Sequence, residues 1–157
     1  MIKLIAIGKN KDKALQSLEK EYVKRLSGFT KIEVVEVKDE ANDHCDRESE
    51  MALVKEKEGK RVLEKLKPSD FVILLDLHGD MLNSETFAKK MKSIYDHHSN
   101  IVFVIAGSLG PSPTLISRSN WRWKLSDLTF THLMTRVLML EQVYRAFMIN
   151  GNRNYHK

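Results

Sequence analysis

Residues 101–110 read IVFVIAGSLG, in which six apolar residues lead into a loop of small ones. A continuous apolar run of this length is typical of a strand that helices cover on both faces of a parallel sheet. A second such run, FVILLDL at residues 71–77, also leads into a turn that contains glycine. Segments with strand-like and helix-like patterns alternate around these two runs. The sequence therefore predicts an α/β domain, with a parallel sheet flanked by helices.

The remaining elements are predicted from apolar periodicity and from turn and capping residues. Strands are expected at 2–7, 31–37, 71–77 and 101–106. Helices are expected at 14–26, at 47–66, from Ser84 onward, and at 132–150, where Gly151 closes the last one. The polar segment 38–46 is expected to form a mobile loop. The charged helix at 47–66, with Glu58 among its acidic residues, is expected to present a solvated face.

The length of 157 residues suits one domain, residues 1–157, and a content of 42% hydrophobic and 30% charged residues argues against disorder. Cys45 is the single cysteine, which excludes an internal disulfide and fits a reducing compartment. No apolar stretch is long enough for a signal-peptide core or a membrane span, so we expect a cytoplasmic protein. His44, Cys45, His97 and His98 lack a metal-ligand spacing, and no metal is expected. The net charge of +5 permits a nucleic-acid partner without requiring one.

The turns that follow the two apolar runs are the expected ligand site, because ligands bind outside the carboxyl ends of the strands in open parallel sheets. The chain contains neither the phosphate-binding pattern GxxxxGK[ST] nor the dinucleotide pattern GxGxxG. The turn at 107–110 has no lysine, and Pro111 and Pro113 follow it without N–H groups to offer. Such a turn suits a neutral ligand such as adenine, held by main-chain groups. A plain tight turn is the alternative.

The expected helix at 132–150 is apolar almost all the way round, which requires burial on more than one side. In a domain of this size, we expect a partner subunit to supply the second cover. The tail at 152–157 follows a glycine stop, has little apolar surface and is expected to fray. Trp121 and Trp123 are expected to be core side chains, with stacking on nucleic-acid bases as the alternative.

Several stretches together carry a resemblance to a known family. They are KLIAIGK at 3–9, VKEKEGKRVL at 54–63, VILLDLHG at 72–79, FVIAGSLG at 103–110, LSDLTFTHLMTRVLMLEQVYRAF at 125–147 and YHK at 155–157. Over essentially its full length, the chain resembles the RlmH-type rRNA methyltransferases of the SPOUT superfamily. The two C-terminal stretches are the most specific, because glycine turns are common in proteins whereas a Thr-Phe-x-His segment that leads into Glu-Gln-x-Tyr-Arg-Ala is not.

The resemblance implies a parallel α/β fold with a C-terminal trefoil knot, a homodimer, and S-adenosyl-L-methionine as methyl donor. The implied reaction is methylation of N3 of a pseudouridine in the 23S rRNA of the large subunit, at the intersubunit bridge of the assembled ribosome. In this family, the knot loops wrap the adenosine of the cofactor with main-chain contacts. The implied cofactor-binding residues are Leu75, Ala106, Gly107, Leu125, Ser126, Asp127, Leu128, Thr129 and Phe130.

Four residues are candidates for catalysis: His132, Arg145, Tyr155 and His156. The N3 proton of the base must leave during methylation, and a general base, or a cation that stabilises the developing anion, lowers the barrier. The resemblance implies that Arg145 and the tail face the cofactor of the other subunit. For His132, a structural role at the helix start is the alternative. The chain departs from the family pattern at Ala106, where glycine is usual.

Two other functions remain open at this point. One is a SPOUT methyltransferase that acts on tRNA or on another rRNA site, which the terminal Tyr-His-Lys argues against. The other is a non-catalytic module that binds the ribosome, and Ala106 is the single feature that favours it.

Overall fold

The computed structural model describes residues 1–42 and 46–157. His44, Cys45 and the middle of the predicted loop 38–46 lie outside the described residues. The strands are β1 (Ile2–Ile7), β2 (Ile32–Val37), β3 (Phe71–Met81), β4 (Ile101–Ile105) and β5 (Trp121–Lys124). The helices are α1 (Lys13–Leu26), α2 (Glu48–Leu63), α3 (Ser84–His97), α4 (Pro113–Arg118) and α5 (His132–Asn150).

The described strands form one sheet in the order β2-β1-β4-β3-β5, and every neighbouring pair is parallel. Strand β4 lies at the centre of this sheet, and each of its residues is buried. In the register of the two central strands, Leu75 of β3 lies beside Ile105 of β4. The predicted α/β class is confirmed, and the two apolar runs that indicated it are neighbouring strands.

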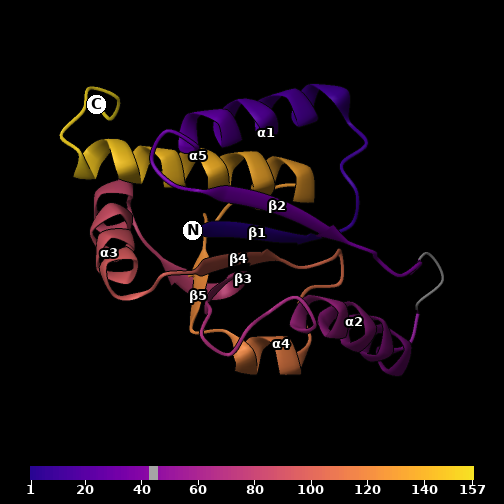
Figure 1. Cartoon of the computed structure of the whole chain (residues 1–157). Helices are drawn as coiled ribbons and strands as arrows, with labels where there is room; N and C mark the ends of the chain where they lie inside the picture. The colour runs from indigo at the N-terminus through magenta and orange to yellow at the C-terminus, as the bar shows by residue number, and fades with distance from the viewer. Residues whose placement is uncertain (43–45) are drawn as a thin grey trace.

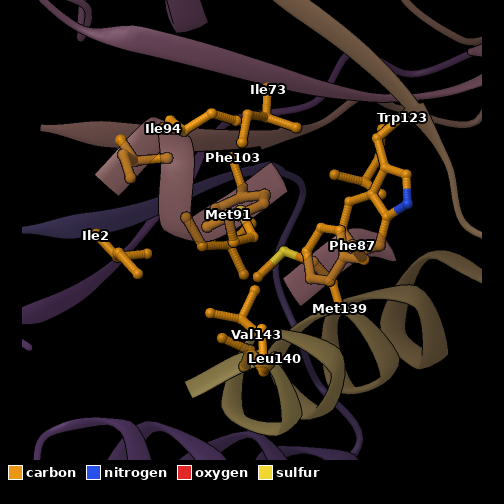
Figure 2. Packing of buried hydrophobic residues seen from close by; sticks show 14 of the residues in the cluster. Ile2, Ile73, Phe87, Met91, Ile94, Phe103, Trp123, Met139, Leu140 and Val143 are labelled. Atoms are coloured by element: carbon orange, nitrogen blue, oxygen red, sulfur yellow. The ribbon is translucent and has the colours of Figure 1, made fainter. Parts of the chain in front are cut away.

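Helices cover both faces of the sheet (Figure 1). Residues of α1, α3 and α5 form the larger core on one face, and residues of α2 and α4 form a smaller core on the other. Figure 2 shows the larger core, in which Phe87 of α3 and Met139 of α5 pack below Phe103 of β4. Trp121 and Trp123 are 7% and 2% exposed, and Trp123 stacks on Phe87 with ring centroids 4.2 Å apart. The two tryptophans are therefore core side chains, as predicted, and are buried away from solvent.

Helix α4 and strand β5 were not predicted from the sequence. Helix α4 has 6 residues, with the side chain of Ser112 capping its start and Pro113 in its first turn. Strand β5 has 4 residues and pairs with β3, which itself extends to Met81 through an irregular register between Leu75 and Asp80. Elements this short carry too few residues for a periodic pattern, and the prolines around α4 favour a loop in any reading of the sequence.

The expectation of a solvated α2 surface is wrong at Glu58, which is 2% exposed. Val54 and Val62 lie one turn before and one turn after it on the helix and are also buried. Glu58 therefore occupies the apolar stripe of α2, although Glu56 on the same helix and Glu64 just after its end are exposed as predicted.

The apolar surface of α5 is covered largely by its own chain. Helices α1 and α3 both pack against α5, α3 toward its C-terminal end, and the sheet lies beneath it (Figure 1). A partner subunit is therefore not required as the second cover, and that argument for a homodimer was wrong, although the homodimer itself stays a prediction. Among the described helices, α5 included, none is both long enough and apolar enough to cross a bilayer.

Arg136 of α5 is 2% exposed and joins this helix to the edge of the sheet. Its Nη1 donates to Glu36 Oε2 at 2.6 Å, and its Nη2 donates to the backbone oxygen of Gly8 at 2.7 Å. Gly8 has φ of +101°, a left-handed conformation that favours glycine. A second carboxylate, that of Glu19, lies 3.8 Å from Nη1. The buried guanidinium thus fixes the start of α5 against the carboxyl ends of β1 and β2.

Replacing Arg136 with alanine is expected to lower the free energy of unfolding by about 3 kcal/mol, because Glu36 and the Gly8 carbonyl lose their buried donor. The matched control is Lys92→Ala, which removes the exposed 2.8 Å ion pair to Asp96. That change should cost less than about 0.5 kcal/mol. Urea denaturation followed by circular dichroism measures both values, and an equally small loss in both variants would show that Arg136 does not anchor α5.

Candidate functional site

A cavity of about 490 Å³ opens beside the carboxyl ends of β3 and β4. Its wall includes Gly107 in the predicted turn after β4, and His78 from the segment after the apolar run 71–77. The turn predicted at that second place is wrong, because β3 continues through an irregular register to Met81 and His78 lies inside it. This volume lies within the range of small-molecule sites. Of the nine predicted cofactor-binding residues, eight line this one cavity: Leu75, Ala106, Gly107, Leu125, Ser126, Leu128, Thr129 and Phe130.

Asp127, the ninth predicted residue, does not line the cavity. Its carboxylate points outward and accepts a hydrogen bond from Lys124 Nζ, with 73% of the Asp127 side chain exposed. The hydroxyl of Ser126 accepts a hydrogen bond from the backbone N–H of Leu128 at 3.1 Å, which turns the chain here. Within residues 125–130, every residue except Asp127 therefore lines the cavity.

The turn after β4 is closed by a hydrogen bond from the N–H of Gly110 to the oxygen of Gly107, at 3.0 Å. Gly110 has φ of +89°, which favours glycine at this corner. Ala106 stands just before the turn with an ordinary backbone, because Asn152 is the only residue other than glycine with positive φ in the described chain. The methyl group of Ala106 is thus placed without backbone strain.

The polar part of the wall includes Asp76, which the sequence analysis did not select. Arg122 donates from Nε and from Nη2 to Asp76 Oδ2, each at 2.7 Å, and the N–H of His78 donates to Oδ1 at 2.9 Å. This carboxylate therefore ties β5 to the irregular part of β3 at the cavity edge. Its signal in the sequence was a single acidic residue inside the apolar run FVILLDL. No group of three or more metal-ligating side chains is present in the described part of the chain.

His132, the first residue of α5, lines the same cavity and is half-buried. Burial, and then the positive charge of Arg136, lower the pKa of His132 below its ordinary value, while a hydrogen bond with the backbone of Ala106 acts in the opposite direction. The imidazole is therefore neutral at neutral pH and has a lone pair that can accept a proton. The structure places this candidate catalytic residue beside the predicted cofactor-binding residues.

Arg145, Tyr155 and His156 lie together at the other end of α5. The hydroxyl of Tyr155 donates to Glu141 Oε1 at 3.1 Å, and Arg145 Nε donates to the same oxygen at 3.1 Å. Arg145 Nη1 and His156 Nδ1 are 3.1 Å apart. Burial, together with Tyr22 and Glu141, raises the pKa of Tyr155, so its phenol stays protonated.

The tail makes contacts at Tyr155 that its sequence did not predict. Tyr155 packs edge-on against Tyr144, with ring centroids 5.0 Å apart, and the guanidinium of Arg145 lies 4.7 Å from the centre of the Tyr155 ring. Glu141 therefore organises a folded tail through contacts that the tail sequence alone does not indicate.

The structure does not bring the tail to the cavity of its own chain. His132 and Arg145 lie 13 positions apart on one continuous helix, which corresponds to about 20 Å along the helix axis. None of Arg145, Tyr155 and His156 lines the cavity. The predicted catalytic residues thus form two groups, one at each end of α5.

Comparisons with known proteins agree with this architecture. A family model described as "Predicted SPOUT methyltransferase" matches residues 1–156. The chain is 45% identical over 157 residues to the ribosomal RNA large subunit methyltransferase H of Latilactobacillus sakei, with 99% of each chain covered. It is 45% identical to the protein named ribosomal RNA large subunit methyltransferase H 1 from Clostridium perfringens and 44% identical to the methyltransferase H of Lacticaseibacillus casei, again with 99% of each chain covered.

A match along nearly the whole chain, at this level of identity, confirms the resemblance that the sequence motifs indicated. The parallel α/β sheet and the cavity beside its central strands fit the same assignment. The chain belongs to the SPOUT methyltransferase family, in the group of the ribosomal RNA large subunit methyltransferases H.

Proposed function

We propose that this protein transfers a methyl group from S-adenosyl-L-methionine to N3 of a pseudouridine in large-subunit rRNA of the assembled ribosome. The observation that carries the proposal is the single cavity beside β3 and β4, which gathers eight of the nine residues that the family resemblance implies for the cofactor. The names of the relatives support large-subunit rRNA as the substrate. We also propose that the protein acts in the cytoplasm. The C-terminal trefoil knot that the family resemblance implies is part of the same proposal.

The residues of the cavity fit this cofactor. Its wall combines the apolar side chains of Leu75 and Leu125 with the glycine turn at 107–110. Main-chain N–H and C=O groups of such a turn match the hydrogen-bonding edge of adenine, and the apolar walls match the faces of the ring. The turn itself contains no lysine, as suits an adenosine site, and Lys55 lies elsewhere on the cavity wall. When bound, S-adenosylmethionine supplies an electrophilic methyl group on a sulfonium.

His132 has the position and the protonation state to act on the substrate. As a neutral imidazole at the cavity wall, it can accept the N3 proton of the base as the nitrogen gains its methyl group. The backbone of Ala106, just before the β4 turn, lies beside the ring. The main contribution of the protein is then to hold the base and the donor in line.

A second copy of the chain is needed in this proposal, because the folded tail lies at the far end of α5. Three large apolar side chains stand exposed on the cavity wall: Leu77 at 62%, Leu128 at 70% and Phe130 at 36%. Exposed apolar clusters of this kind mark interaction surfaces. A homodimer that covers them can bring Arg145 and the tail of one subunit to the cavity of the other.

One of the two alternatives loses the feature that favoured it. The non-catalytic module was favoured by Ala106 alone, and the ordinary backbone at this residue leaves the cavity wall intact. The other alternative, methylation of tRNA or of another rRNA site, is distinguished by the position of the label in the assay described next.

Incubation with methyl-labelled S-adenosylmethionine should label ribosomes from a strain that lacks this gene, and mass spectrometry should place one methyl group on N3 of a pseudouridine in large-subunit rRNA. Separated subunits and purified tRNA are the matched controls and should remain unlabelled. Label on tRNA or on another nucleotide would contradict the substrate assignment, and no label on any RNA would contradict methyl transfer itself.

The turnover number should fall as the pH drops through a value below 6.5, the ordinary pKa of histidine, because the folded-state pKa of His132 is lowered and the base is active only when neutral. Above that value the rate should be independent of His132 titration. The variant His132→Gln should be slower by at least about 100-fold and should lack the acidic limb. A pH-rate profile with an unchanged acidic limb in His132→Gln would show that this residue is not the base.

Two inactive variants should complement each other if the site is shared between subunits. We expect a chain with His132→Gln, mixed in equal amounts with a chain that lacks residues 155–157, to regain about a quarter of wild-type activity, since half of the dimers are mixed and each holds one intact site. The measurement is methyl incorporation after unfolding and joint refolding. Activity no higher than that of either variant alone would refute the shared site.

A further inference from the structure

Glu58 is a buried carboxyl group that no step above uses. It lies in α2 on the face of the sheet opposite α5 and is 2% exposed. Its Oε2 accepts a hydrogen bond from the backbone N–H of Glu40 at 3.0 Å. Its Oε1 has no hydrogen-bond partner among the described residues. A buried oxygen of this kind destabilises the fold, so its presence here calls for another role.

The carboxyl group of Glu58 lies directly behind the turn at residues 107–110, which we call the cofactor turn. A Cβ atom on Gly107 would come within 2.6 Å of Glu58 Oε1 and 3.0 Å of Oε2. Gly107 itself lines the cavity. The turn is thus held between the cavity on one side and Glu58 on the other, and the absence of a side chain at residue 107 permits this close approach.

The close packing continues along the next residue of α2. Gly59 has no room for a side chain, because a Cβ atom there would lie 2.5 Å from the hydroxyl oxygen of Ser112. Ser112 follows the turn and caps α4. Glu58 and Gly59 therefore form one contact surface that supports the chain from Gly107 to Ser112.

Glu58 also connects the turn to the segment that follows β2. Its partner Glu40 is paired with Arg61 of α2, and Arg61 Nη1 donates to the backbone oxygen of Lys38 at 2.8 Å. Asn42 Nδ2 donates to the hydroxyl of Ser108, within the turn, at 2.6 Å. The buried carboxyl therefore lies where α2, residues 38–42 and the cofactor turn meet.

The charges that face Glu58 come from these same elements. They are Asp39 and Glu40 from the segment after β2 and Arg61 from α2. Burial raises the pKa of Glu58, the N–H of Glu40 acts against this, and the negative charge of Asp39 adds to it. A neutral carboxyl group, and equally a glutamine amide, can occupy this position.

We propose that Glu58 is a positioning residue for the methyl donor: it supports the Gly107 turn from behind, so that the main-chain groups of the turn are fixed before the ligand binds. This inference rests on the proposed function, which assigns the cavity to S-adenosylmethionine. Glu58 does not touch the ligand and acts through the turn. Its effect should therefore appear in cofactor affinity and in the rigidity of residues 107–110.

The first test is calorimetry with S-adenosylmethionine on Glu58→Leu, Glu58→Gln and the control Glu50→Leu, which changes an exposed residue of the same helix. Glu58→Leu should bind at least about tenfold more weakly, because leucine cannot accept the hydrogen bond from the Glu40 N–H that ties Glu58 to the segment after β2. Glu58→Gln should restore affinity to within about threefold of wild type, as should Glu50→Leu. Wild-type affinity in Glu58→Leu, or equal losses in the leucine and glutamine variants, would overturn the proposal.

Hydrogen exchange measured without ligand separates this proposal from the proposed function. The N–H of Gly110, which donates to Gly107, should exchange at least about tenfold faster in Glu58→Leu than in Glu50→Leu or wild type. Unchanged exchange would overturn the positioning role. Failure of wild-type protein to bind S-adenosylmethionine, together with faster exchange in Glu58→Leu, would overturn the ligand assignment and not the role of Glu58.

A double substitution tests the contact itself if the leucine variant fails to fold. Gly107→Ala should weaken S-adenosylmethionine binding at least about tenfold when Glu58 is present and less than about threefold when Glu58 is replaced by alanine, because the added methyl group then has space. Equal losses in both backgrounds would show that Glu58 and Gly107 do not act together.

Discussion

The buried guanidinium of Arg136 is the interaction on which the arrangement of the site depends. It lies one turn after His132 on α5 and bonds to Glu36 and to the carbonyl of Gly8, at the carboxyl ends of β2 and β1. This edge of the sheet is also the edge at which the cavity opens. Because the guanidinium is held there, the first turn of α5 cannot shift along the sheet, and its charge helps to keep His132 neutral.

Helix α5 then divides the candidate functional groups between its two ends. His132 faces the cavity, whereas Glu141 gathers Arg145 and Tyr155 near the C-terminus of the chain. A rigid helix cannot bring its two ends together, so both groups can serve one reaction only if a second copy of the chain supplies the missing half. The exposed apolar side chains on the cavity wall are where that copy would bind.

The central strands and the place of the cavity could be predicted from the sequence, because strands buried on both faces leave continuous apolar runs and parallel sheets bind ligands at their carboxyl ends. The roles of Glu58 and Tyr155 could not. Glu58 resembles the exposed glutamates of α2 in sequence, and only the position of Gly107 across the fold shows why it is buried. Tyr155 is held by Glu141 and Tyr144, contacts that depend on how the tail folds back. Helix α4 and strand β5 were missed because each is too short to show a period.

The most direct test of the account is a crystal structure of the protein with S-adenosylhomocysteine, the product left after methyl transfer. The account predicts a homodimer in which the adenine lies against main-chain groups of residues 107–110, the sulfur faces His132, and the tail of the second copy reaches the same cavity. A product molecule bound elsewhere, or a cavity that the tail of neither copy reaches, would contradict it.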